Sequence, residues 1–260
     1  MIRIPKKGKT ASVIIFALLL TASAAALPDF EVLCVKRIEV YGNKTVSSGS
    51  IADACAPYLG KSLLAADKSA IRESVETDPY LCVRSVRRIL PDTVKITVRE
   101  RKPCAAIETD DGYLLMDEEG TLLENRAVLG EERSLPVIRG IGTVSAPLGG
   151  QADTGSDAMK KAKTLLSELR LQNAEERVIG IDMSNVKDIL LSTDCGIEVE
   201  MGTARRLDEK VAWLKELLPL LAEEKRVGVL RLASVGKGAA FRPYRTEKSV
   251  ENTAKAEKIR

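Results

Sequence analysis

An ordered series of strand, helix and turn signals between Val35 and Pro103 sets the tightest limit on how this chain folds. The series opens with VKRIEVYGN, in which apolar and charged residues alternate up to Gly42-Asn43. Such alternation predicts a half-buried strand, and the Gly-Asn pair predicts its end. The series closes with VRSVRRI and VKITVRE, two strand patterns on either side of Pro91-Asp92. A connection this short predicts an antiparallel hairpin.

Two short helices are expected between the first strand and the hairpin. Apolar residues at helical spacing run over 51–59 and end at Gly60, a residue typical of a helix C-terminus. A second helix is expected to begin at Asp67, which is a good N-cap residue, to carry Ile71 and Val75 one turn apart, and to stop at Asp78-Pro79. The order β-α-α-β-β in about seventy residues predicts a three-stranded sheet with both helices on one face.

The amino-terminal segment predicts export. Residues 1–10 hold four basic side chains and no acid, and residues 11–27 carry no charge at all. As a helix, the uncharged segment would span about 25 Å, near the lower limit for crossing a bilayer. The basic residues place the amino terminus in the cytoplasm and everything after Pro28 outside. Two interpretations stay open: a retained single-pass anchor, or a signal peptide cleaved after Ala24-Ala25-Ala26.

Composition excludes several classes of function. The 260 residues contain no histidine, which removes the commonest general base and zinc ligand. Aromatic residues make up 3% and the net charge is only +3, so neither an aromatic-lined sugar cleft nor a nucleic-acid surface is indicated. No cofactor and no small-molecule substrate are expected. The five cysteines form no C-x-x-C motif; Cys55 and Cys82 are the best candidates for a disulfide, with free buried thiols as the alternative.

Residues 103–244 predict a second, mixed domain, so the expected class is α+β. Strands are expected in a hairpin over 107–116, at 135–138, and at 178–183, 188–192 and 197–201. Amphipathic helices are expected at 156–171 and 207–224, the second kinked or ended early by Pro219. Two last strands follow at 227–232 and 239–242, and residues 245–260 are expected to form a disordered tail.

Two motifs resemble catalytic sequences but lack their context. Asp153-Thr154-Gly155 spells the loop of an aspartic protease, without a second copy or an apolar strand before it. Ser184 and Lys187 have the Ser-x-x-Lys spacing of penicillin-binding enzymes, but fall in a turn between strands. We therefore expect no enzyme, with an exported hydrolase as the alternative.

Seven basic residues gather on the hairpin of the first domain and just after it: Arg84, Arg87, Arg88, Lys95, Arg99, Arg101 and Lys102. They are expected to form the polar face of a one-sided sheet. The alternative is electrostatic docking onto an acidic partner or anionic lipid headgroups.

Sequence stretches in both predicted domains carry a resemblance to a known family. IEVYGN, LLAAD and DPYLCVRSVRRILPDTVKITVRERKP follow one another as in the POTRA domain of the bacterial division proteins FtsQ/DivIB. GYLLMDEEGTLLE, LPVIRG and VLRLASVGKGAAFRP are similar to the later part of that family, although its usual ending has an Asp shortly before the Leu-Arg pair, where this chain has Val229. The resemblance implies a cytoplasmic arm at 1–10, a retained anchor at 11–27, a POTRA-like domain at 34–102 and a β domain at 103–244.

The resemblance also implies a function. FtsQ/DivIB proteins are non-enzymatic division scaffolds of the bacterial plasma membrane, found at the septum with FtsB/DivIC and FtsL partners, and help to regulate septal wall synthesis. The alternative is another POTRA-bearing envelope assembly or secretion component.

The last strands are the expected docking site. An unpaired strand near the carboxyl terminus exposes backbone donors and acceptors to which a partner's strand can pair. Small residues there permit close approach, and the resemblance implies that the FtsB/DivIC-like partner binds in this region. The candidate residues are Val229, Arg231, Ala233, Ala239 and Phe241. The alternative is that these strands simply close the core.

Overall fold

The computed structural model describes residues 33–130, 135–152, 155–232 and 238–244. The expected arm, anchor and tail, together with Asp153 and Ala233, lie outside the described residues. Within the described ranges, the helices are too short or too polar to cross a membrane.

The described chain forms two compact units. The first contains the described residues up to Thr77 and then Leu81–Glu100. The second contains the short segment Asp78–Tyr80 and the chain from Arg101 onward. Each unit has its own hydrophobic core, so each is described by itself.

The first unit has the expected β-α-α-β-β order. Its sheet has the strand order β1-β3-β2, in which β1 is parallel to β3 and β2 is antiparallel to it. The elements are β1 (Arg37–Tyr41), α2 (Ser48–Ala54), the 3-10 helix η2 (Ala56–Tyr58), α3 (Lys68–Val75), β2 (Leu81–Ile89) and β3 (Thr93–Glu100).

Local signals in the sequence explain these helices. The Asp67 carboxylate accepts a hydrogen bond from the Ser69 N–H at 2.9 Å, which is the expected N-cap of α3. Ile71 and Val75 are both 1% exposed and pack on the sheet. The expected helix over 51–59 is divided, because α2 ends at Ala54 and Pro57 shapes the 3-10 turn that follows. The Pro91-Asp92 turn lies between β2 and β3 as expected.

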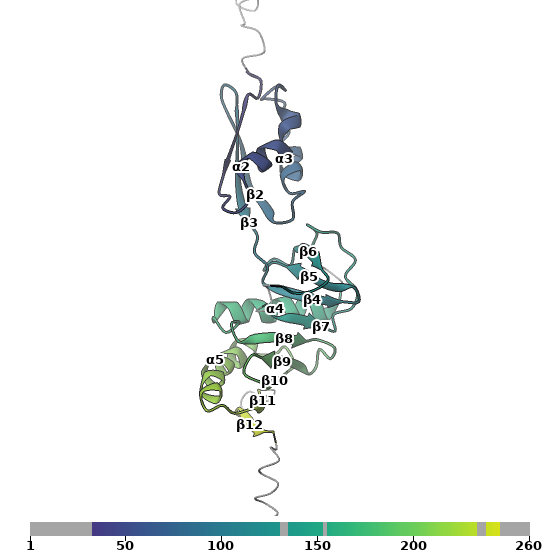
Figure 1. The fold of residues 1–260 in the computed structure, drawn as a ribbon, viewed down its shortest axis with the longest axis vertical. Coiled ribbons are helices and arrows are strands. Elements are labelled where there is room, and N and C mark those ends of the chain that lie inside the picture. The colour runs from purple at the N-terminus through teal and green to yellow at the C-terminus, as the bar shows by residue number, and fades with distance from the viewer. Residues whose placement is uncertain (1–32, 131–134, 153–154, 233–237, 245–260) are drawn as a thin grey trace, which may run out of the picture. The chain divides into compact units, whose positions relative to one another are not determined.

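The second unit is built on one large sheet. Its described strands have the order β12-β11-β10-β9-β8-β7-β4-β5-β6. Figure 1 shows this succession from β6 to β12, with α4 and α5 beside the sheet. The elements are β4 (Ala105–Thr109), β5 (Gly112–Met116), β6 (Leu122–Arg126), β7 (Val137–Arg139), α4 (Asp157–Leu171), β8 (Val178–Asp182), β9 (Ile189–Thr193), β10 (Ile197–Gly202), α5 (Leu207–Glu223), β11 (Gly228–Arg231) and β12 (Ala240–Pro243).

Both helices pack on the same face of this sheet. Leu165 of α4 and Leu214 of α5 are fully buried in one cluster with strand residues such as Ile138 and Val199. The opposite face is covered only around β4, β5 and β6, where Ala106 and its neighbours form a small cluster under loop residues. The rest of that face carries polar side chains of the alternating strands, such as Ser192 and Glu198, together with the exposed Leu190.

Two details differ from the sequence-based expectations, and the cysteines resolve an open alternative. Helix α5 continues past Pro219 to Glu223. The proline is exposed, and burial of Leu214 and Leu218 compensates for the one helical hydrogen bond that it cannot make. Strand β6 was not expected, because its sequence LLENR lacks an apolar alternation. Of the two alternatives for the cysteines, the bond between Cys55 and Cys82 is not formed: Cys55 is a buried thiol and Cys82 a partly buried one.

Candidate functional site

The two ends of the large sheet differ in how they are covered. At the β6 end, the loop over 147–152 closes the start of the strand. The Leu122 N–H donates to the Gly150 carbonyl at 2.9 Å, and the Gly149 N–H donates to the Leu122 carbonyl at 2.7 Å. The Gln151 amide also donates to the Thr121 hydroxyl at 3.2 Å. This end of the sheet therefore begins under a hydrogen-bonded cover.

The other end of the sheet is β12. Its four residues pair antiparallel with β11, with Leu230 opposite Phe241 and Arg231 opposite Ala240. In the described part of the chain, no strand pairs with the outer side of β12. An unpaired edge of this kind presents backbone donors and acceptors to another chain.

The hydrogen-bond pattern shows which groups of β12 face outward. The Tyr244 N–H donates to the Val227 carbonyl at 3.1 Å. In an antiparallel pair, the backbone N–H and C=O of successive residues point alternately toward the partner strand and away from it. The backbone groups of Arg242 and Ala240 therefore point toward β11, like those of Tyr244. The N–H and C=O of Phe241 therefore point outward, as does the C=O of Pro243.

Pro243 suits this position. A proline has no N–H to donate, and in sheets it is confined to places where the ladder needs no donor. At position 243 the missing donor would have pointed away from β11, so the β11–β12 ladder stays complete. The proline also limits how an added strand can pair, because only its carbonyl is available there.

The five candidate residues occupy different environments. Val229 is buried in β11, which is flanked by β10 and β12, so its backbone is already paired on both sides. Arg231 also lies in β11, but its exposed side chain pairs with Glu200 on β10. Ala239 and Phe241 are half-buried against the core. Ala233 lies outside the described residues. Of the described candidates in β11 and β12, only Phe241 is on the open strand.

Side chains on the helix-free face brace this end of the sheet. The Arg231 guanidinium beside Glu200 holds the pKa of that carboxyl below its usual range. A hydrogen bond to Glu198 raises the pKa of the Tyr244 phenol. These two links join β10 to β11 and to the end of β12, and neither was anticipated from the sequence. Tyr244 could have been assigned to the same strand from the sequence, because Ala240, Arg242 and Tyr244 occupy alternate positions.

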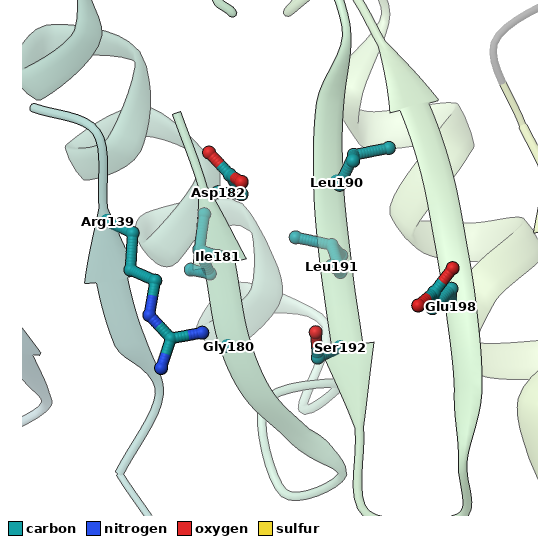
Figure 2. A pocket seen from close by; sticks show the side chains of 8 residues that line it. All are labelled: Arg139, Gly180, Ile181, Asp182, Leu190, Leu191, Ser192 and Glu198. Carbon is teal, nitrogen blue, oxygen red and sulfur yellow. The ribbon is translucent and has the colours of Figure 1, made fainter. Parts of the chain in front are cut away.

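A pocket of about 180 Å³ lies on the sheet face between β7 and β10. Figure 2 shows the Arg139 side chain extending toward Gly180, and both residues line the pocket. The Arg139 guanidinium donates to Glu108 at 2.8 Å, and the Asp182 carboxylate accepts the Ser184 N–H at 2.8 Å. Hydrogen bonds from Ser184 lower the pKa of Asp182. The charged groups that line this pocket are thus engaged with neighbouring groups, Arg139 with Glu108, Asp182 with Ser184 and Glu198 with Tyr244.

Of the two motifs that resemble catalytic sequences, only Ser184 and Lys187 lie within the described residues. Ser184 follows β8 in a turn, and the Lys187 N–H donates to the Asn185 side chain at 3.1 Å within the same turn. Both residues lie between strands, whereas the Ser-x-x-Lys geometry requires a helix. The Ser-x-x-Lys spacing in this chain therefore belongs to a turn and lacks the helix of penicillin-binding enzymes.

Comparison with known proteins now decides the family. Residues 33–101 match the model described as "POTRA domain, FtsQ-type", and residues 105–235 match "Cell division protein FtsQ/DivIB, C-terminal". The chain belongs to the FtsQ/DivIB cell-division family. The two matches cover both units, so the alternative of a different POTRA-bearing protein is not supported.

Individual members of the family are distant in sequence. The chain is 29% identical over 187 residues to the cell division protein FtsQ of Koribacter versatilis, a match that covers 69% of this chain and 52% of that protein. It is 25% identical over 160 residues to DivIB of Clostridium acetobutylicum, covering 62% of each. A solved extracytoplasmic domain of DivIB from Geobacillus stearothermophilus matches with 19% identity and a TM-score of 0.31, covering 49% of this chain and 98% of that one. The chain thus spans between half and two thirds of the length of these two relatives.

Proposed function

We propose that this protein is a non-enzymatic scaffold of the division machinery that binds a partner by adding the partner's strand to β12. The partner is an extracytoplasmic segment of an FtsB/DivIC-like division protein, which acts together with an FtsL-like protein. The uncharged segment 11–27 anchors the chain in the plasma membrane at the septum, and partner binding helps to regulate septal wall synthesis.

The observation that carries this proposal is the outer edge of β12, which has outward backbone groups and no strand partner among the described residues. The start of β6 is hydrogen-bonded to a loop, whereas the N–H and C=O of Phe241 point away from β11. A strand laid beside β12 would satisfy these groups and the Pro243 carbonyl.

The magnitude of these bonds limits what the edge can do alone. A net contribution of about 0.5–1.5 kcal/mol per hydrogen bond gives a few kcal/mol for a short ladder, while micromolar affinity needs about 8 kcal/mol. Side-chain contacts must therefore supply the remainder, and the exposed Arg231 and Arg242 and the half-buried Phe241 flank the edge. Anchoring both partners in one membrane also raises their effective concentration.

A pair of substitutions at one position tests the role of the backbone. Phe241→Pro removes the outward N–H and leaves the bonds to β11, as the native Pro243 does two residues later. Phe241→Ala removes the side chain and keeps the N–H. We expect the proline variant to bind the partner segment roughly tenfold to a hundredfold more weakly than the alanine variant, because a partner carbonyl loses its donor.

The measurement is a binding titration of the full chain, in detergent, with the FtsB/DivIC-like segment. Equal binding of Phe241→Pro and the unmodified chain would refute strand addition. Equal losses in the two variants would instead show that the Phe241 side chain, not the backbone, makes the contact.

A further inference from the structure

Four large apolar side chains are exposed at one end of the first unit. Leu59, Leu64, Ile89 and Leu90 are 47%, 59%, 44% and 67% exposed. Leu59 and Leu64 belong to the segment between α2 and α3, whereas Ile89 ends β2 and Leu90 begins the β2–β3 turn, so the two pairs are far apart in the sequence. Apolar residues grouped at one place on a surface often mark a contact site, so these four side chains are candidates for binding another molecule or a membrane.

Backbone hydrogen bonds bring these segments together where the described chain begins. The Leu63 N–H donates to the Leu33 carbonyl at 2.6 Å, and the Gly60 N–H donates to the Val35 carbonyl at 2.9 Å. On the other side, the Lys36 N–H donates to the Asp92 carbonyl at 2.8 Å. Segments 33–37, 59–68 and 88–92 therefore form one end of the unit, here called the apex (Figure 1).

The apex is also basic. Its three segments contain five basic side chains, Lys36, Arg37, Lys61, Lys68 and Arg88. Its two carboxylates are both engaged within the unit: Asp67 caps α3, and Asp92 pairs with Arg37 at 3.1 Å. The Arg88 guanidinium also donates to the Ala66 carbonyl at 2.7 Å, so two of the five basic side chains, Arg37 and Arg88, have partners within the unit. Apolar side chains beside lysine and arginine are typical of surfaces that lie in the headgroup region of an anionic bilayer.

The sequence keeps the apex close to the proposed anchor. Only residues 28–32 lie between the uncharged segment, which ends at Leu27, and Leu33. Even fully extended, this connection spans at most about 20 Å, because each residue adds no more than about 3.6 Å. The two acids in it, Asp29 and Glu31, are outnumbered by the basic side chains of the apex.

We infer that the apex rests on the membrane, with Leu90, Leu64 and Leu59 in the interfacial layer and the surrounding lysines and arginines against anionic headgroups. The inference rests on the anchor in the proposed function, but is independent of partner binding at β12. The contact fixes the orientation of the first unit relative to the bilayer, which a flexible connection alone would leave free. The occupant is the lipid surface and not a second protein.

A single tryptophan reports this contact. Trp213 is the only tryptophan in the chain, so Trp213→Phe with Leu90→Trp leaves one reporter at the apex. The matched control carries Trp213→Phe with Tyr41→Trp. Tyr41 is also exposed, but lies at the far end of β1, four residues beyond the pair Arg37–Thr93 and thus roughly 13 Å farther along the strand.

The full chain is placed in lipid nanodiscs that contain phosphatidylglycerol and acyl chains labelled with bromine. We expect the emission of Leu90→Trp to be shifted to shorter wavelength and quenched at least about twofold more than that of Tyr41→Trp, because only the apex reaches the interfacial layer. Replacing phosphatidylglycerol by phosphatidylcholine should reduce the quenching, since the basic side chains then lose their counter-charge.

The outcomes separate this inference from the proposed function. A chain that stays with the nanodisc while Leu90→Trp is no more quenched than the control overturns the inference alone. A chain that does not stay with the lipid overturns both the inference and the anchor. A change at Leu90→Trp that needs the partner segment would assign the apex to a protein and also overturn the inference.

Discussion

Glu100, the last residue of β3, and Arg101, the residue after it, make hydrogen bonds in different units. The Glu100 carboxylate accepts the N–H groups of Lys44, Thr45 and Val46 at 2.6, 2.7 and 2.9 Å, which ties the loop after β1 to β3. The next residue, Arg101, donates to Asp117 at 2.6 Å within the second unit. In the Glu-Arg-x-Pro sequence that closes the first domain, Glu100 thus stabilises the first unit and Arg101 the second.

Glu100 should make the stability of the first unit depend on pH. The backbone N–H of Lys44, with those of Val46 and Thr45, lowers the pKa of Glu100 from about 4.5 to about 2. Because the folded pKa is depressed, the stabilisation is present above about pH 4.5 and is lost as the pH falls toward 2. We expect Glu100→Gln to lower the free energy of unfolding by about 1–2 kcal/mol at pH 7, and to cost little at pH 2.

Urea unfolding, followed by hydrogen exchange of peptides from the first unit at the two pH values, measures this difference. Glu73→Gln is the matched control, because Glu73 is exposed on α3 and its carboxylate makes no hydrogen bond or ion pair with the residues that the structure describes. A Glu100→Gln variant as stable as the control at pH 7 would contradict the prediction.

At the scale of elements, β12 depends on a close approach to β11. Gly228 lies opposite Pro243, and a Cβ at Gly228 would overlap the Arg242 carbonyl oxygen and lie 2.7 Å from Pro243 Cα. Both obstacles are backbone atoms, which cannot rotate away as the end of a side chain can. A side chain at position 228 must therefore displace β12.

We expect Gly228→Ala to release β12 and to weaken partner binding without changing any residue of the open edge. Hydrogen exchange of residues 240–244 should become faster, since the ladder that protects Arg242 and Tyr244 is disturbed. Partner binding should fall at least about tenfold if strand addition needs an ordered β12.

The control for this variant is Gly130→Ala. Position 130 lies in the same unit, and a Cβ there would meet no atom within 4 Å. Slow exchange over 240–244 in Gly228→Ala, equal to that of the control, would show that β12 tolerates the side chain.

At the scale of the whole molecule, the proposed scaffold depends on being held where its partner is. Tethering two proteins to one membrane replaces dilution in bulk solution by a high effective concentration, so that modest contacts suffice. This fits a short edge strand whose backbone bonds contribute only a few kcal/mol.

We therefore expect a chain without residues 1–27 to bind the partner segment in solution with unchanged affinity, but to be lost from the septum. Fluorescent fusions in dividing cells measure the location, and a titration measures the affinity. An unrelated single-pass anchor in place of residues 11–27 should restore the septal bands. An even envelope signal from the intact chain would argue against the division role.

Much of the fold could be predicted from the sequence, while the open edge could be predicted only in part. The N-cap at Asp67, the hairpin at Pro91-Asp92 and the last two strands follow from local signals. Strand β6 has two leucines followed by polar residues, a pattern that does not predict a strand. Its extended conformation is stabilised by pairing with β5. Val229 and Arg231 were grouped with the edge, since nothing local distinguishes an interior strand from an outer one.

The sequence by itself determined most of the order of the elements, because caps, turns and apolar periodicity act over a few residues, and its resemblance to FtsQ/DivIB indicated the family. The tertiary structure alone decided that β12 is the outermost of the described strands at its end of the sheet and that β11 is enclosed between β10 and β12. It also decided that Lys210, 2% exposed on α5, donates to the carbonyls of Met201 and Thr203. The physical reason is that strand order and burial arise from pairing between segments distant in the chain, and the backbone groups of a strand are the same whether it lies inside a sheet or at its edge.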